Sequence, residues 1–168
     1  MSTPFNTDGG IHKIPLPIAT GHLWLCGKHH IGPQVETVLA ERNNAMAVCL
    51  VQEHELADRY PEYVQWHKDN AGSRALWFPI HDLSYPNLTN SIDFISTLTD
   101  HLRNDQSLVV HCAAGIGRAG TTATALLMML GMNSTDALAH VRAHRPMAGP
   151  EAGSQLDFLN ELATHLAQ

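Results

Sequence analysis

Hydrophobic residues along this chain form short runs of strand length that alternate with stretches of helical periodicity. Residues 45–51 are almost continuously apolar, which is typical of a strand buried on both faces. Between residues 89 and 104, apolar side chains instead recur every three or four positions, which predicts a helix capped by Thr89. The strands predicted in this way are 22–27, 45–51, 75–80 and 107–112, and the helices are 33–43, 55–70 with a break near Pro61, 89–104, 118–132, 135–144 and 153–166.

This alternation predicts an α/β fold: a single domain with a central, mostly parallel sheet flanked by helices. A chain of 168 residues with 44% hydrophobic residues is large enough to bury one core. Residues 1–20 are polar and contain three prolines, so they are interpreted as an N-terminal arm or lead-in, and residues 21–168 as the domain itself.

Charge and cysteine content exclude several classes of protein. The formal net charge is -6, so no overall basic field favours nucleic acid or anionic lipid. No apolar run approaches the roughly 18 residues of a membrane span, and the N-terminus lacks a signal-peptide pattern. Three cysteines do not make a disulfide framework, which predicts that the protein resides in a reducing cytoplasm.

The histidines give no clear metal site. Only His140 and His144 have helical i,i+4 spacing, without an obvious third ligand, so neither metal nor cofactor is expected.

One stretch, HCAAGIGRAGTT (residues 111–122), combines a cysteine, an arginine and three glycines. Cys112 ends a predicted strand, where open α/β sheets bind ligands. The small residues that follow allow successive backbone N–H groups to surround an anion at a helix N-terminus, and the same positive field stabilises a thiolate. Arg118 can hold two oxygens of a phosphate from the opposite side. The pattern therefore predicts attack by sulfur on a bound tetrahedral oxyanion; an inert buried cysteine would leave the glycines and the arginine unexplained.

The segment HCAAGIGRAG resembles the HCxxGxxR signature of cysteine-dependent protein tyrosine phosphatases, and the agreement from about Leu23 to Leu162 is most similar to the compact atypical dual-specificity phosphatases. The resemblance implies metal-free hydrolysis of phosphate monoesters through a phosphocysteine intermediate by a catalytic domain at residues 21–168. It makes Cys112 the nucleophile. The residues implied to bind phosphate, or phosphate analogues such as vanadate, are Ala113, Ala114, Gly115, Ile116, Gly117 and Arg118.

The same family uses a general acid from an upstream loop and often a glutamine that positions water for the second step. Asp82, thirty residues before Cys112 in a polar, proline-containing segment, is the predicted acid, with His81 as the alternative. Gln155 lies in GPEAGSQLDFL, which resembles the glutamine segment of the family. His111 is implied to support the loop by hydrogen bonds.

The chain departs from the family at Ala119, where relatives usually carry a serine or threonine that helps the sulfur to leave. Thr122 lies one helical turn further on and is the nearest substitute on that face. We therefore expect an active but slow enzyme. Cys49 could trap an oxidised Cys112, although apolar filling of a strand is the simpler interpretation.

Relatives directed to inositol lipids tend to carry lysines in this loop, which has none here, and tyrosine-selective relatives are usually longer because an added loop deepens their pocket. The resemblance and the length of 168 residues therefore favour a shallow pocket that accepts phosphotyrosine and phosphoserine or phosphothreonine in proteins and peptides. Three alternatives remain open: a phosphatase of a small non-protein phosphate ester, a phosphate-binding module with little turnover, and a rhodanese-like sulfurtransferase. The glycine pattern and the segment around Asp82 argue against the last.

Overall fold

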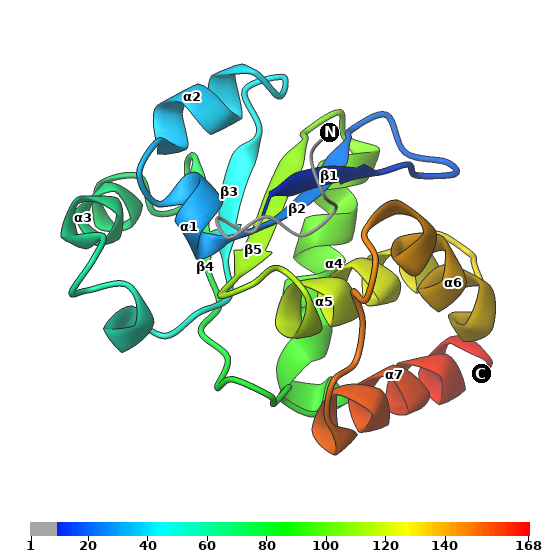
Figure 1. The fold of residues 1–168 in the computed structure, drawn as a ribbon. Helices are drawn as coiled ribbons and strands as arrows, with labels where there is room; N and C mark the ends of the chain where they lie inside the picture. Colours follow the sequence, from blue (N-terminus) through cyan, green and yellow to red (C-terminus); the bar gives the residue numbers. More distant parts are fainter. Residues whose placement is uncertain (1–9) are drawn as a thin grey trace.

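The sheet at the centre of the molecule has five strands (Figure 1). This computed structural model describes residues 10–168. From one edge to the other the strands are β1 (Ile11–Ile14), β2 (Leu23–Gly27), β5 (Leu108–Cys112), β3 (Met46–Cys49) and β4 (Ala75–Trp77). All neighbouring pairs are parallel except β1 and β2, which run antiparallel. The predicted α/β fold with a mostly parallel sheet is confirmed.

Helices cover both faces of this sheet (Figure 1). One face packs against α1 (Lys28–Ile31), α2 (Val35–Ala40) and α3 (Pro61–Asp69), and a short 3-10 helix, η1 (Glu53–Glu55), precedes α3. The other face carries α4 (Leu88–Arg103), α5 (Gly117–Met129) and α6 (Ser134–His144), and α7 (Gly153–Leu166) packs on these helices, mainly on α5. Of the helix predicted at 55–70 with a break near Pro61, only the part after the break forms, as α3, which Pro61 begins. The part before the break was wrong, because Glu55 ends η1 and residues 56–59 form turns.

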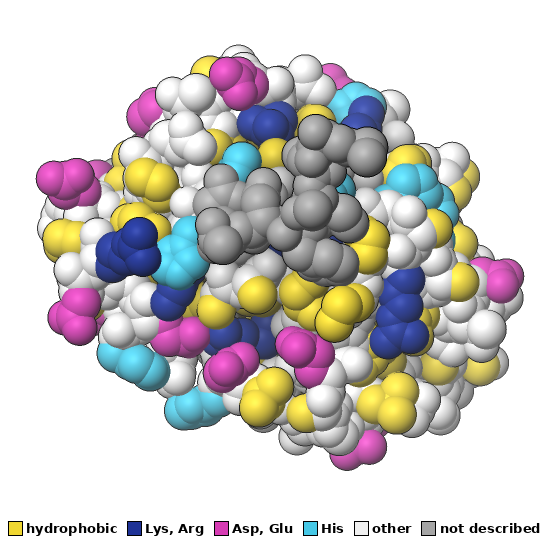
Figure 2. All heavy atoms as spheres, viewed as in Figure 1, with side chains coloured by type: hydrophobic (Ala, Val, Ile, Leu, Met, Phe, Trp, Pro, Cys, Tyr) yellow, Lys and Arg dark blue, Asp and Glu magenta, His cyan; other side chains and the backbone are white. Residues whose placement is uncertain are grey.

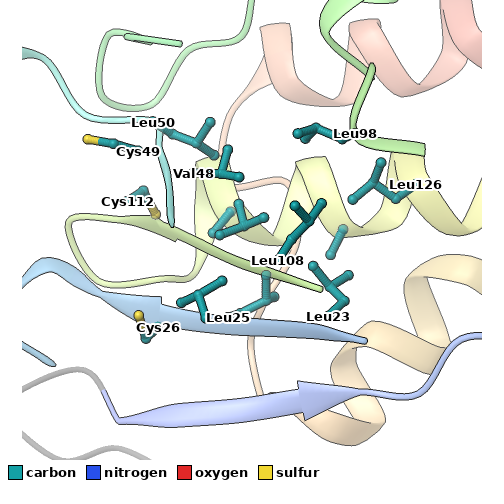
Figure 3. Packing of buried hydrophobic residues seen from close by; sticks show 14 of the residues in the cluster. Leu23, Leu25, Cys26, Val48, Cys49, Leu50, Leu98, Leu108, Cys112 and Leu126 are labelled. Atoms are coloured by element: carbon teal, nitrogen blue, oxygen red, sulfur yellow. The ribbon is translucent and has the colours of Figure 1, made fainter. Parts of the chain in front are cut away.

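The central position of β5 and α5 follows from their composition. Every residue of β5 is buried, as expected for a strand with neighbours on both sides and helices on both faces. All residues of α5 from Gly117 to Met128 are buried too, because α4, α6 and α7 surround this helix. Figure 3 shows leucines of β2, β5, α4 and α5 meeting between the sheet and the helices.

The parallel register brings three strand ends together. Gly27 of β2 and Cys112 of β5 are register partners, and Cys49 of β3 pairs with His111 of β5. The segments that follow β2, β3 and β5 therefore leave the sheet at the same edge, where α/β folds place their ligand sites.

Three local features differ from the sequence-based expectations. Ile11–Ile14, which the sequence places in the arm, forms edge strand β1, and the rest of the arm, residues 1–9, lies outside the described residues. A short α1 was not predicted. The cap of α4 is Asn87 rather than Thr89, because the Asn87 side chain accepts a hydrogen bond from the Asn90 N–H. Within residues 10–168 no helix has the length and apolar character needed to cross a membrane.

Candidate active site

The loop of residues 113–116 connects β5 to α5 and forms the floor of the site. Gly115 has φ +75°, in the left-handed region, and a Cβ there would collide with the Cys26 carbonyl, so only glycine fits. The Lys28 N–H donates to the Ala113 carbonyl at 3.0 Å, which ties the loop to the end of β2. Among residues 10–168, no acceptor takes the backbone N–H groups of residues 113–116, so these donors are available to an anion.

Arg145, at the end of α6, stabilises the same loop by hydrogen bonds to its carbonyl groups. Its Nε donates to the Gly115 carbonyl at 2.7 Å and its Nη2 to the Ala114 carbonyl at 2.9 Å. Its Nη1 donates to His12 Nδ1 at 2.6 Å. The side chain is buried and bridges the loop to β1. Arg145 thereby satisfies the Gly115 carbonyl, which would otherwise be buried without a partner, and also binds the more exposed Ala114 carbonyl.

Cys112 and Arg118 face a pocket of about 180 Å³ whose other lining residues are Asp82, Leu83, Ala113, Ala114, Gly117 and Glu151. Cys112 is almost completely buried at the end of β5. His111, directly before it, lies behind the pocket: its Nε2 meets the Tyr63 hydroxyl at 2.8 Å and its Nδ1 meets the Cys112 carbonyl at 3.2 Å. Burial lowers the pKa of His111 to about 4, so its ring is neutral near pH 7 and supports the loop through hydrogen bonds.

Arg118 is held in place by Glu55, a residue that the sequence analysis did not identify. The two carboxylate oxygens accept from Nη1 at 2.8 Å and from Nη2 at 2.9 Å, a bidentate pair. The second Nη1 hydrogen goes to the Ile80 carbonyl at 2.7 Å. Two donors of the guanidinium are left, the Nε–H and the second Nη2–H, which lie side by side and match two oxygens of a phosphate.

The charges of this pair are strongly coupled. Burial acts to raise the pKa of Glu55, but hydrogen bonds from Arg118 and from the Gln52 N–H outweigh it and lower that pKa. Burial acts to lower the pKa of Arg118, and the Glu55 carboxylate outweighs it in the same way. Both groups therefore stay charged at neutral pH, and the positive guanidinium remains beside Cys112.

Asp82 lies at the mouth of the pocket with an exposed side chain. Its Oδ1 is 3.5 Å from Arg118 Nη2 and accepts from the Leu83 N–H at 2.9 Å. Leu83 has φ +60°, an uncommon conformation that turns the loop sharply directly after Asp82. The alternative acid, His81, is exposed and does not line the pocket.

The other predicted residues lie close by but have backbone partners. Gln155 is completely buried: its Oε1 accepts from the Glu151 N–H at 2.7 Å and its Nε2 donates to the Ser84 carbonyl at 3.4 Å. Its amide thus joins the Asp82 loop to the segment before α7, and its proposed role in placing water stays a prediction. The Thr122 hydroxyl bonds the Tyr85 hydroxyl at 2.7 Å and the Arg118 carbonyl at 2.9 Å.

Sequence reasoning missed Glu55, Arg145 and Glu151. A signal existed for Glu55, because it follows a buried strand that ends at the same edge of the sheet as Cys112. Arg145 and Glu151 carried no such signal, since both reach the site from loops next to C-terminal helices.

The fold and the loop define a cysteine phosphatase architecture, and comparisons with known proteins agree. The family model Tc-R-P, described as "Polymorphic toxin system, DSP-PTPase phosphatase", matches residues 28–132. Mouse dual specificity protein phosphatase 8 is 36% identical over 96 residues, covering 54% of this chain and 13% of that protein. The putative tyrosine phosphatase 123R of invertebrate iridescent virus 6 is 32% identical over 94 residues, covering 55% of this chain and 63% of the viral protein.

Solved structures show the same architecture over nearly the whole chain. Tk-PTP in its active form is 25% identical with a TM-score of 0.68, covering 90% of this chain and 96% of that one. Kinase associated phosphatase shares the fold, with a TM-score of 0.75, 21% identity and coverage of 99% and 98%.

The chain belongs to the DSP-PTPase phosphatase family of polymorphic toxin systems, because the family model matches well over half of it. It has the compact form of an atypical dual-specificity phosphatase. It spans less than two thirds of the length of the curated relatives it matches.

Proposed function

We propose that this protein hydrolyses phosphate monoesters of proteins and peptides, phosphotyrosine together with phosphoserine and phosphothreonine, through a phosphocysteine intermediate. The observation that carries the proposal is the arrangement around Cys112. Within residues 10–168, the backbone N–H groups beneath the pocket and two donors of Arg118 beside it have no hydrogen-bond acceptor. A dianionic phosphoryl group needs this set of donors.

In the first step, Cys112 Sγ attacks phosphorus, the S–P bond forms and the P–O bond to the leaving group breaks. The donors of the loop and of Arg118 bind the three equatorial oxygens, where charge is spread in the transition state. Asp82, in its protonated form, donates its proton to the departing oxygen. Its place at the mouth, 3.5 Å from Arg118, suits a group that meets the leaving oxygen on the side away from the sulfur.

In the second step, water attacks phosphorus, the S–P bond breaks and the Cys112 thiolate leaves with its electron pair. Asp82, now ionised, takes the proton from the attacking water, so phosphate is released and the starting protonation state returns. Gln155 would help to place this water only if its amide exchanged the Ser84 carbonyl for the water.

The test is hydrolysis of p-nitrophenyl phosphate by the wild type and by Cys112→Ser, with and without a chelator. We expect hydrolysis that vanadate inhibits and the chelator does not affect, and no turnover by Cys112→Ser although it still binds phosphate. Turnover by Cys112→Ser would refute the mechanism. A panel of phosphopeptides and small phosphate esters compared by kcat/KM then separates protein from metabolite substrates.

Replacing the proposed acid should make the rate depend on the leaving group. Asp82→Asn cannot donate a proton, so phenyl phosphate hydrolysis should slow about 10²–10³-fold. Esters whose leaving groups have low pKa should slow less than about tenfold, because they depart without a proton. The neighbouring His81→Asn is the matched control and should leave both rates unchanged. Equal slowing of both classes by Asp82→Asn would remove Asp82 from the role of acid.

A hydroxyl at position 119 should accelerate the second step. Ala119 is fully buried directly after Arg118, and the Thr122 hydroxyl is already engaged by Tyr85. Rapid-quench kinetics of the wild type should therefore show a burst of leaving group followed by slow turnover. Ala119→Ser should raise steady-state turnover several-fold with the burst rate unchanged. An absent burst, or turnover that stays as slow in Ala119→Ser, would show that breakdown of the intermediate is not limiting.

A further inference from the structure

Three side chains with metal-binding atoms meet behind the catalytic loop. Cys49 ends β3, His67 lies on α3 and His111 ends the neighbouring part of β5, and one ligand atom of each lies within 4.8 Å of the others. Cys49 and His111 are register partners, so their side chains emerge on the same face of the sheet. Figure 3 shows the Cys49 sulfur turned away from the leucine cluster. The three residues are buried and none of them lines the pocket.

His67 is the unusual member of this cluster. Its ring is 2% exposed, and among residues 10–168 neither ring nitrogen has a hydrogen-bond partner. Aromatic rings surround it, with Tyr63 at 4.7 Å and Trp77 at 5.3 Å between ring centroids. A buried polar group without a partner destabilises the folded state. A ligand that accepted the lone pair of one ring nitrogen would remove that cost.

The two histidines differ in how readily they can offer a lone pair. Among residues 10–168 neither ring nitrogen of His67 has a partner, whereas His111 would exchange the hydrogen bond between its Nε2 and the Tyr63 hydroxyl for the metal. Burial raises the pKa of Cys49 far above its usual range, so this thiol would release one proton when a metal binds.

We propose that Cys49, His67 and His111 bind one Zn²⁺ ion behind the catalytic loop. One thiolate and two imidazoles are typical zinc ligands, with about 2.3 Å to sulfur and 2.0–2.1 Å to nitrogen. Tetrahedral geometry then sets the donor atoms about 3.3–3.8 Å apart. Ligand atoms within 4.8 Å of one another need to close by only about 1 Å.

The surroundings supply a compensating charge. The Glu55 carboxylate acts electrostatically on both Cys49 and His111 and favours a cation there, whereas the Arg118 guanidinium opposes it. Because the Glu55 charge is neutralised mainly by Arg118, the Cys49 thiolate supplies most of the charge that balances zinc.

The experiment is a zinc titration of the Cys112→Ser variant. This variant lacks the thiol of the active-site pocket, which could otherwise bind zinc itself. We expect one equivalent of zinc to bind with the release of one proton, and the midpoint of thermal unfolding to rise with zinc concentration, because the ion links β3, α3 and β5. Cobalt(II) should bind in its place and show a thiolate-to-metal absorption band. These measurements need no catalytic turnover, so they stand whether or not the proposed phosphatase activity is found.

Matched variants identify the ligands. Adding Cys49→Ala to Cys112→Ser should abolish the thiolate band and weaken zinc binding at least 100-fold, and His67→Phe should do the same. Cys26→Ala removes another buried cysteine, on β2, and should change neither measurement. His140→Ala tests the partly buried His140–His144 pair in the same way. The proposal fails if Cys112→Ser binds no zinc, if Cys49→Ala keeps the band, or if His140→Ala alone abolishes binding.

Discussion

Replacement of Glu55 by glutamine should lower kcat/KM about 100-fold. The amide keeps the size of the carboxylate but presents an NH₂ group to a guanidinium that needs two acceptors, so one of the two hydrogen bonds to Arg118 is lost. The guanidinium is then free to turn away from the position in which its Nε–H and Nη2–H face the phosphate. A misplacement of about 1 Å in a group that positions substrate can cost about 10²-fold in rate.

The control for this prediction lies in the same 3-10 helix. Glu53 is exposed and pairs with Lys68 at 2.9 Å, so Glu53→Gln should stay within twofold of the wild type. Steady-state kinetics with an aryl phosphate measure both variants, and circular dichroism checks that both are folded. If Glu55→Gln were as active as Glu53→Gln, Arg118 would not depend on Glu55 for its orientation.

Arg145→Met should both destabilise the protein and weaken phosphate binding by the catalytic loop. The substitution removes the donor from the buried Gly115 carbonyl and from the more exposed Ala114 carbonyl, and a buried acceptor without a partner costs about 1–3 kcal/mol. We expect the free energy of unfolding to fall by about 2–3 kcal/mol. In the fraction that remains folded, kcat/KM should fall at least tenfold and vanadate should bind more weakly, because the loop amides lose their orientation.

Chemical denaturation and vanadate inhibition check this expectation. Arg103→Met is the control: Arg103 is exposed and its Nη2 makes one hydrogen bond, to the Met129 carbonyl, so its loss should cost less than about 1 kcal/mol. Arg145→Lys should recover only part of the stability, since one ammonium group cannot reach both carbonyls with the geometry of a guanidinium. If Arg145→Met were as stable as the wild type, the loop would hold its conformation without hydrogen bonds from Arg145.

The predicted elements followed largely from local chemistry. The continuous apolar run at residues 45–51 became β3, and the helical periodicity of residues 89–104 became α4, within one or two residues at most ends. Strand β1 was not predicted, because residues Ile11–Ile14 have no clear strand pattern in the sequence. They form a strand because they pair with β2. The cap of α4 moved to Asn87 because the choice between neighbouring polar residues depends on where the chain turns.

For the pocket, too, part of the site could be predicted from the sequence and part could not. Cys112, the loop and Arg118 are contiguous in sequence, so their chemistry can be inferred from spacing alone. The alternation of strands and helices likewise determined the class of fold, because burial patterns are local. Only the tertiary structure decided what surrounds them: Glu55 on Arg118, Arg145 beneath the loop, and His67 beside Cys49 and His111. These partners are separated by tens of residues, so their contacts exist only in the folded chain, where Glu55 follows β3, Arg145 ends α6 and His67 lies on α3.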